Sequence, residues 1–164
     1  MYDLGREQRL DKYDLAHATV REILTEMKDI SEIMVDLAYA SIMFDSEEIA
    51  EEVKNLEEDM EELSKNIRIK AMLSARTHKD ATKLSSLLEV AAASRRISNA
   101  AGDIVKLMEC EVDKRPFLTF ILREAEEKIK RLVLADVSDM VGRQIGELGV
   151  ESETGMRIIA IKRG

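Results

Sequence analysis

The chain has 164 residues, of which 45% are hydrophobic and 35% charged, and its formal net charge is -8. This composition excludes a disordered chain. The negative net charge argues against a nucleic acid partner, because phosphate backbones repel an acidic protein. One proline, seven glycines, three tyrosines, three phenylalanines and no tryptophan favour long helices with a core of Leu, Ile, Val, Met and Ala.

The first segment carries hydrophobic or small residues at alternating spacings of four and three. Such spacing is the a/d seam of a packed helix and predicts a helix from about Tyr13 to Phe44. The seam residues are Ala16, Val20, Ile23, Met27, Ile30, Met34, Leu37, Ser41 and Phe44.

The second helix is expected after a tight turn at Asp45-Ser46-Glu47-Glu48, with Asp45 as its N-cap in a capping box with Glu48. Its seam continues to about Leu73 or Ala75. Between residues 45 and 62 the sequence has ten carboxylates and one lysine, which predict either a solvated helix face or a surface that attracts cations. The seam residues are Ile49, Val53, Leu56, Met60, Leu63 and Ile67.

A third helix is expected after the break at residues 77–80, with Thr77 or Asp80 as its N-cap. The middle of its seam is made of small residues, which allow a neighbouring helix to approach closely. Three helices with short turns predict an antiparallel up-down-up bundle over residues 1–113. The third seam is Leu84, Leu87, Ala91, Ser94, Ser98, Ala101, Val105, Met108 and Val112.

The sequence changes character at Pro116, which suits the first turn of a linker helix within residues 114–130. Beyond it, 132–134 and 156–161 are short apolar runs typical of strands, separated by a glycine-rich stretch with a helical turn between Ser138 and Leu148. The expected fold is therefore mainly α, and α+β overall. Residues 131–164 are too few to bury a core alone, so we expect this segment to pair with another chain or to belong to a longer domain.

Two pairs of residues with oxygen-bearing side chains are candidate metal ligands. Glu57 and Glu61 have i,i+4 spacing on the second predicted helix, and Asn99 and Asp103 have the same spacing on the third. If the pairs face each other, their oxygens would suit a hard divalent cation or iron. The alternative is a solvated acidic stripe.

The basic C-terminal end is a candidate ligand site. Arginine side chains on a strand beside a glycine turn bind phosphate or carboxylate groups in bidentate fashion, although ordinary outward charges remain the alternative. No phosphate-binding glycine loop, nucleophile elbow, histidine pair or cysteine pair is present, so we expect no enzyme activity and no catalytic residue. The candidate ligand-binding residues are Arg143, Arg157, Ile159, Ile161 and Arg163.

Residues from about 10 to 112 resemble a PhoU-type helical domain. The resemblance rests on the three heptad helices, on Glu57 and Glu61, and on the string 96–104, Arg-Ile-Ser-Asn-Ala-Ala-Gly-Asp-Ile. The sequence departs from the family motif, because Arg95 stands at the position of a glutamate, Asn99 at that of an aspartate and Asp103 at that of an asparagine. The resemblance implies a metal-binding adaptor in phosphate transport signalling.

Residues from about 130 to 164 resemble the first part of a TrkA-C domain, the C-terminal domain of RCK proteins. The matching strings are 141–149, Val-Gly-Arg-Gln-Ile-Gly-Glu-Leu-Gly, and 153–164, Glu-Thr-Gly-Met-Arg-Ile-Ile-Ala-Ile-Lys-Arg-Gly. The resemblance implies a ligand-sensing, dimerising module of potassium transport systems, some of which bind a cyclic dinucleotide.

These features together predict a regulatory protein of potassium or other cation transport, with phosphate signalling as the alternative. We expect a homodimer that contacts a membrane channel or transporter subunit. The lone Cys110 allows no internal disulfide, and no apolar run approaches the roughly 20 residues of a membrane span. We therefore expect a cytoplasmic protein, brought to the membrane only by its partner. The effector remains open between a cyclic dinucleotide and a metal ion.

Overall fold

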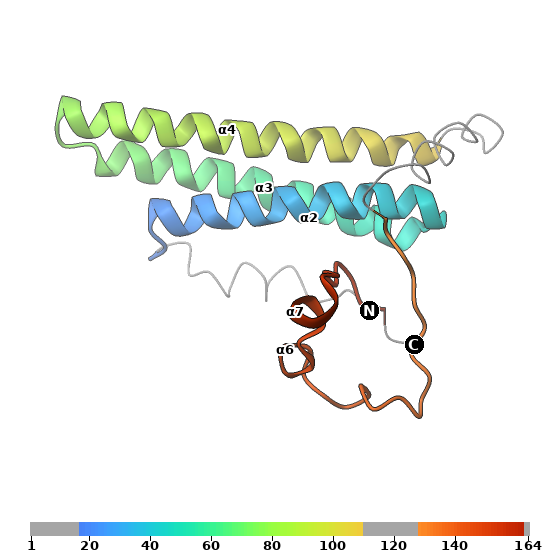
Figure 1. The fold of residues 1–164 in the computed structure, drawn as a ribbon. Coiled ribbons are helices and arrows are strands. Elements are labelled where there is room, and N and C mark those ends of the chain that lie inside the picture. The colour runs from blue at the N-terminus through green and yellow to red at the C-terminus, as the bar shows by residue number, and fades with distance from the viewer. Residues whose placement is uncertain (1–16, 110–127, 163–164) are drawn as a thin grey trace.

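The computed structural model describes residues 17–109 and 128–162. Three long helices dominate it: α2 (Val20–Phe44), α3 (Glu47–Ser74) and α4 (His78–Lys106). Successive helices run in opposite directions and lie side by side along most of their length (Figure 1). A single 3-10 turn, η1 (Leu107–Glu109), follows α4. The predicted antiparallel three-helix bundle is confirmed.

The core lies along the seams that the heptad spacing predicted. Met27 and Met34 of α2 and Val53 and Ile67 of α3 have no exposed surface. Burial of apolar surface of this kind is the main force that holds helices together. The described helical core comprises Ile23, Met27, Ile30, Met34, Leu37, Ala38, Ala50, Val53, Leu56, Met60, Leu63, Ile67, Ala91, Ala101 and Val105.

Helix α4 contributes mainly small side chains to this core, as its sequence predicted. Ser98 is fully buried, and its hydroxyl donates to the Met34 sulfur over 3.0 Å. Leu87, expected in the seam, is 37% exposed. The helix ends at Lys106, so the prediction that the seam runs to Val112 falls partly outside the described residues.

The start of α2 corrects one prediction. The helix begins at Val20, not near Tyr13, because Thr19 forms a capping box with Glu22. The Thr19 hydroxyl accepts from the Glu22 amide over 3.2 Å, and the Glu22 carboxylate accepts from the Thr19 amide over 2.7 Å. Residues 13–16 lie outside the described part of the chain.

The turn between α2 and α3 corrects a second prediction. Asp45 is the C-cap of α2, with a left-handed φ of 47°, and is not the N-cap of α3. Ser46 is that N-cap, and its side chain accepts from the Ile49 amide. So short a turn requires one left-handed residue, a conformation that aspartate tolerates better than most side chains. At α4, Thr77 is the N-cap, as one of the two expected alternatives.

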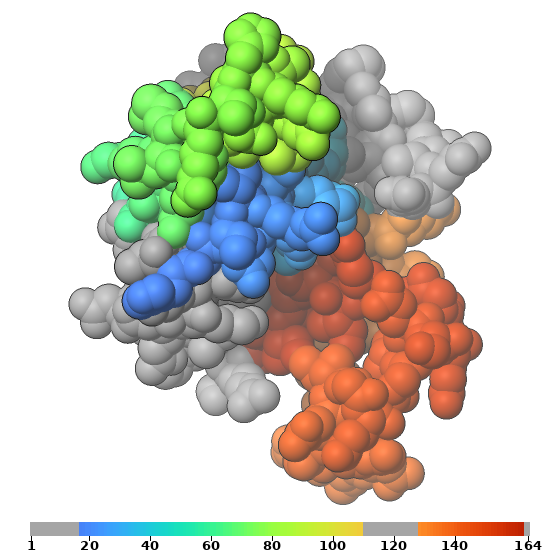
Figure 2. Space-filling model, turned by 90° about the vertical axis from the view of Figure 1, so that its left-hand side faces the viewer, coloured from blue at the N-terminus to red at the C-terminus, as the bar shows by residue number. Residues whose placement is uncertain are grey.

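The C-terminal segment, residues 128–162, lies on the α2 side of the bundle (Figures 1 and 2). Its regular structure consists of α6 (Ile145–Leu148) and α7 (Val150–Thr154), so the predicted turn between Ser138 and Leu148 is helical only over its last four residues. The apolar runs 132–134 and 156–161 form no strand within this described segment. A strand needs a neighbouring strand to pair its backbone groups, and these short runs do not pair with each other.

Most of the predicted linker helix, 114–130, lies outside the described residues, and 128–130 are not helical. The α+β character and the domain boundaries therefore stay predictions. In the described ranges no helix is both long and apolar enough to cross a membrane.

Candidate functional site

All four predicted metal ligands lie on two neighbouring helices. Glu57 and Glu61 lie on α3, and Asn99 and Asp103 lie on α4. The two helices pack against each other, and Glu57 and Glu61 contact Gly102 and Arg95 of α4, close in sequence to Asn99 and Asp103.

Glu61 is bound by a cation of the opposite helix. The Arg95 Nη2 lies 3.0 Å from the Glu61 Oε1, and the two side chains are 37% and 62% exposed. Arg95 is one of the three residues at which the sequence departs from the expected family motif, and it stands at the position of a glutamate. The substitution therefore places a positive charge against the carboxylate that a metal would otherwise use.

Asp103 is likewise paired, in this case within α4. The Lys106 ammonium donates to the Asp103 Oδ1 over 2.7 Å. This hydrogen bond is the main reason why the pKa of Lys106 is raised above its ordinary value of 10.5, and Glu57 adds a weaker attraction. A lysine therefore neutralises part of the acidic charge at this end of α4.

Glu57 lies directly against the backbone of α4 at Gly102. A Cβ added to Gly102 would come within 2.8 Å of the Glu57 Oε2. Glycine at this position therefore leaves the space that the carboxylate occupies. In the residues that the structure describes, no three or more His, Cys, Asp or Glu side chains form a group able to hold a metal ion, and metal binding here stays a prediction.

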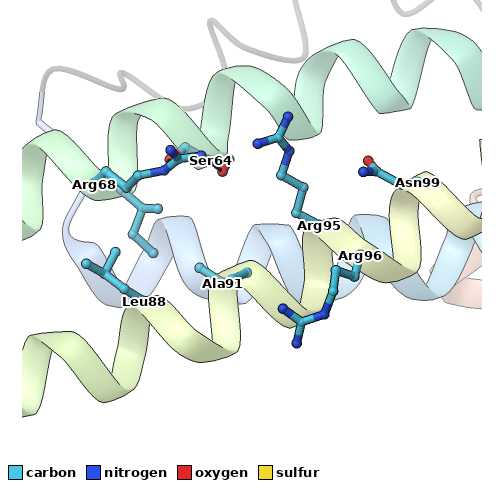
Figure 3. A pocket seen from close by; sticks show the side chains of 9 residues that line it. Ser64, Arg68, Leu88, Ala91, Arg95, Arg96 and Asn99 are labelled. Atoms are coloured by element: carbon cyan, nitrogen blue, oxygen red, sulfur yellow. Dashed lines mark hydrogen bonds between the residues drawn. The ribbon is translucent and has the colours of Figure 1, made fainter.

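A groove of about 520 Å³ lies along the same two helices and adjoins these residues, because Asn99 also lines it. Arg68 extends along α3 to Ser64, while Arg95 extends from α4 towards α3 on the other side of Ser64 (Figure 3). The Arg96 guanidinium points away from α3 in the same view. The groove is lined by Ser64, Ile67, Arg68, Leu88, Ala91, Ala92, Arg95, Arg96 and Asn99.

The predicted ligand-binding residues of the C-terminal segment have different surroundings. The Arg157 Nη2 donates to the Asp36 carboxylate of α2 over 2.6 Å, and the Arg157 Nη1 lies 3.9 Å from Glu32. The hydrogen bond to Asp36 is the main cause that raises the pKa of Arg157. Arg157 therefore joins the C-terminal segment to the bundle.

Three further contacts join this segment to the bundle. Lys162 binds the Glu48 carboxylate at 2.5 Å, and Ala160 packs against the bundle core. The Arg131 guanidinium carbon lies 5.6 Å from the centre of the Phe44 ring, within the range of a cation–π contact. The surface of α2 and the start of α3 therefore act as the docking face for residues 131–162.

The remaining ligand candidates differ in their exposure to solvent. Arg143 is exposed, Ile159 is half-buried, and Ile161 is 39% exposed. Arg163 lies outside the described residues. Ligand binding by this set of residues stays a prediction.

Two residues of interest were missed by sequence analysis. Asp59 is 2% exposed on α3, and nothing in the sequence separates it from the solvated carboxylates around it. Arg68 was also overlooked, although its i,i+4 spacing from Ser64 on a predicted helix was a usable signal.

Comparison with known proteins gives one family. The model of the PhoU domain matches residues 24–108, which is more than half of the chain. The match includes most of α2 and all of α3 and α4. No curated protein matches the chain significantly.

Proposed function

Because the chain belongs to the PhoU domain family, we propose that it is a regulatory adaptor of a membrane transport system and not an enzyme. The long bundle would supply a rigid surface for a transporter subunit. The C-terminal segment would supply the response to a ligand. Within this role, the transported ion is potassium or another cation.

The observation that carries the proposal is the contact of Arg157 with Asp36 and Glu32. Arg157 belongs to the segment that resembles a TrkA-C sensor, and its guanidinium is bound to α2. An anionic ligand that took this guanidinium would compete with the two carboxylates. Ligand binding and docking of the segment would thus be mutually exclusive, which is the basis of a population shift between two states.

The choice of potassium rests on the string 141–149 and on 153–164, which resemble the TrkA-C domain. In this hypothesis a ligand held between two C-terminal segments stabilises one homodimer geometry. The stiff helices then transmit the change to a channel or transporter subunit at the cytoplasmic face of the membrane.

Titration calorimetry of the full chain with cyclic di-AMP, ATP and potassium tests the sensor. We expect one of the three to bind. For an anionic ligand, Arg157→Gln should weaken binding, and Asp36→Asn with Glu32→Gln should strengthen it. Arg76→Gln removes the same charge at the distant α3–α4 turn and is the matched control. Absence of binding by all three probes would remove the sensor role.

The alternative is a metal-binding adaptor in phosphate transport signalling, with which the family match is at least as consistent. Metal analysis of protein purified without chelator discriminates between the two. Stoichiometric iron or zinc that is lost on combining Glu57→Ala with Asp103→Ala would support the alternative. Metal-free protein would leave the cation-transport hypothesis in place.

A further inference from the structure

The groove between α3 and α4 contains more hydrogen-bond donors than the described residues use. Arg68 donates through Nε to the Ser64 carbonyl over 3.0 Å and through Nη2 to the Ser64 hydroxyl over 2.9 Å. A guanidinium has five N–H donors, so three remain. Among the described residues no carboxylate pairs with Arg68.

Arg95 is only partly satisfied as well. Its Nη2 donates to Glu61, while its Nε is buried and has no hydrogen-bond partner within residues 17–109 and 128–162. Buried donors are nearly always paired, so an unpaired one needs an explanation. The Arg95 guanidinium is half-buried, so its attraction for an anion is screened less than it would be in bulk water.

The Arg68 and Arg95 side chains line the same groove. Figure 3 shows Arg68 and Arg95 on opposite sides of Ser64, one from each helix, with Asn99 further along α4. This cationic arrangement stands out in a chain with a net charge of -8. Below it, Ile67, Ala91 and Leu88 provide an apolar floor.

We propose that this groove binds a phosphoryl group, held between Arg68 and Arg95 beside Ser64. Guanidinium groups bind oxyanions through paired, charge-assisted hydrogen bonds. A phosphoryl group carries more oxygens and more negative charge than a carboxylate, so it can accept from two guanidinium groups on different sides at once. The apolar floor suits the organic part of a phosphate monoester.

Glu61 competes for the site. Its ion pair with Arg95 is largely exposed, and exposed pairs of this kind are weak. A phosphoryl group would displace Glu61 from Arg95 without the need to unpack either helix. Removal of the Glu61 charge should therefore strengthen ligand binding, a gain that a purely structural role of the pair would not produce.

Calorimetry of the full chain at low ionic strength, with inorganic phosphate, AMP and acetate as probes, tests the proposal. We expect phosphate or AMP to bind more tightly than acetate. Tighter binding of AMP than of phosphate would identify an organic phosphate as the ligand class, and equal binding would identify free phosphate. Equal affinity for acetate, or no binding of phosphate and AMP at millimolar concentration, would overturn the proposal.

The variants make the test specific. Arg68→Gln and Arg95→Gln should each weaken binding about tenfold to a hundredfold, the value of a charge-assisted contact. Glu61→Gln should strengthen it about twofold to fivefold. Arg76→Gln and Glu51→Gln change the net charge equally at exposed sites outside the groove and should leave the affinity unchanged. Equal effects of the control variants would mean diffuse attraction and would overturn the site.

Resonances of the arginine side chains give a second measurement that does not depend on affinity. Addition of AMP should shift the Nε–H signals of Arg68 and Arg95 and leave that of Arg157 in place. A shift confined to Arg157 would overturn the groove assignment. The same measurement distinguishes the two proposals, because the groove is tested by Arg68 and Arg95 and the sensor is tested by Arg157.

Discussion

Ser98 lies at the contact between α4 and α2. It is fully buried, and its hydroxyl donates to the sulfur of Met34. Leucine at this position would add apolar volume to a closely packed contact, and overpacking of this kind costs about 1–3 kcal/mol. We therefore expect Ser98→Leu to lower the free energy of unfolding by that amount, measured by urea denaturation.

Ala100→Leu is the matched control, because Ala100 is exposed on the same helix. It should change the stability by less than about 0.5 kcal/mol. If Ser98→Leu were as stable as the control, the close contact between α2 and α4 at Ser98 would be wrong.

Gly102 presents two opposing effects. Alanine in a helix interior is about 1 kcal/mol more favourable than glycine, but the new Cβ would lie 2.8 Å from the Glu57 Oε2. The carboxylate is the free end of a flexible side chain, so it moves at small cost. We expect Gly102→Ala to raise the free energy of unfolding by about 0.5–1 kcal/mol, measured by thermal and urea unfolding.

A double-mutant cycle with Glu57→Ala isolates the contact. If the Cβ only displaces the carboxylate, the coupling energy should be below about 0.5 kcal/mol. A strong loss of stability in Gly102→Ala that Glu57→Ala restores would contradict the expectation.

At the scale of the element, the N-terminus of α4 depends on one capping box. The Thr77 hydroxyl accepts from the Asp80 amide over 3.2 Å, and the Asp80 carboxylate accepts from the Thr77 amide over 3.1 Å. Loss of such a cap costs about 1 kcal/mol. We expect Thr77→Ala to lower stability by about that amount, observed in the urea midpoint and in faster amide exchange over residues 78–82.

Thr82→Ala serves as the control, because Thr82 lies inside α4 and its hydroxyl donates only to the His78 carbonyl of the preceding turn. Alanine is the better helix former, so this variant should be neutral or slightly more stable. An equal loss in both variants would mean that capping by Thr77 does not stabilise α4.

At the scale of the whole molecule, docking of the C-terminal segment should depend on pH. The hydrogen bond from Lys162 holds the pKa of Glu48 below its ordinary value of 4.5. A lowered pKa means that the docked state favours the ionised carboxylate. Its contribution is therefore complete above pH 4.5 and is lost as the pH falls through the lowered pKa. We expect hydrogen exchange of residues 156–162 to increase over that range.

Glu48→Gln should raise exchange in residues 156–162 at neutral pH and remove part of its dependence on acid. Glu51 is also exposed near the start of α3, but Lys162 pairs with Glu48. Glu51→Gln should therefore leave the exchange rates of residues 156–162 as they are in the unaltered protein. Salt should weaken docking too, because the contacts of Arg157 and Lys162 are exposed ion pairs. Exchange that is insensitive to both pH and salt would rule out the ionic contacts as the cause of docking.

The heptad spacing was sufficient to predict three helices, their antiparallel order and most of the core. A period of three and four residues places one set of side chains on one face whatever that face contacts. It did not determine the helix ends to the residue. Asp45 and Ser46 are both good caps, and the length of the turn decided that Asp45 ends α2 while Ser46 begins α3.

Only the tertiary structure decided how charged groups on different elements are paired. The sequence placed Glu57 and Glu61 on one helix face and Asn99 and Asp103 on another, but it could not show that Arg95 binds Glu61 or that Arg157 binds Asp36, because partners 34 and 121 residues apart meet only after the helices have packed. The runs 132–134 and 156–161 form no strand within the described residues for a related reason. Local composition favours an extended chain, whereas a strand exists only where tertiary structure supplies a neighbour for its backbone.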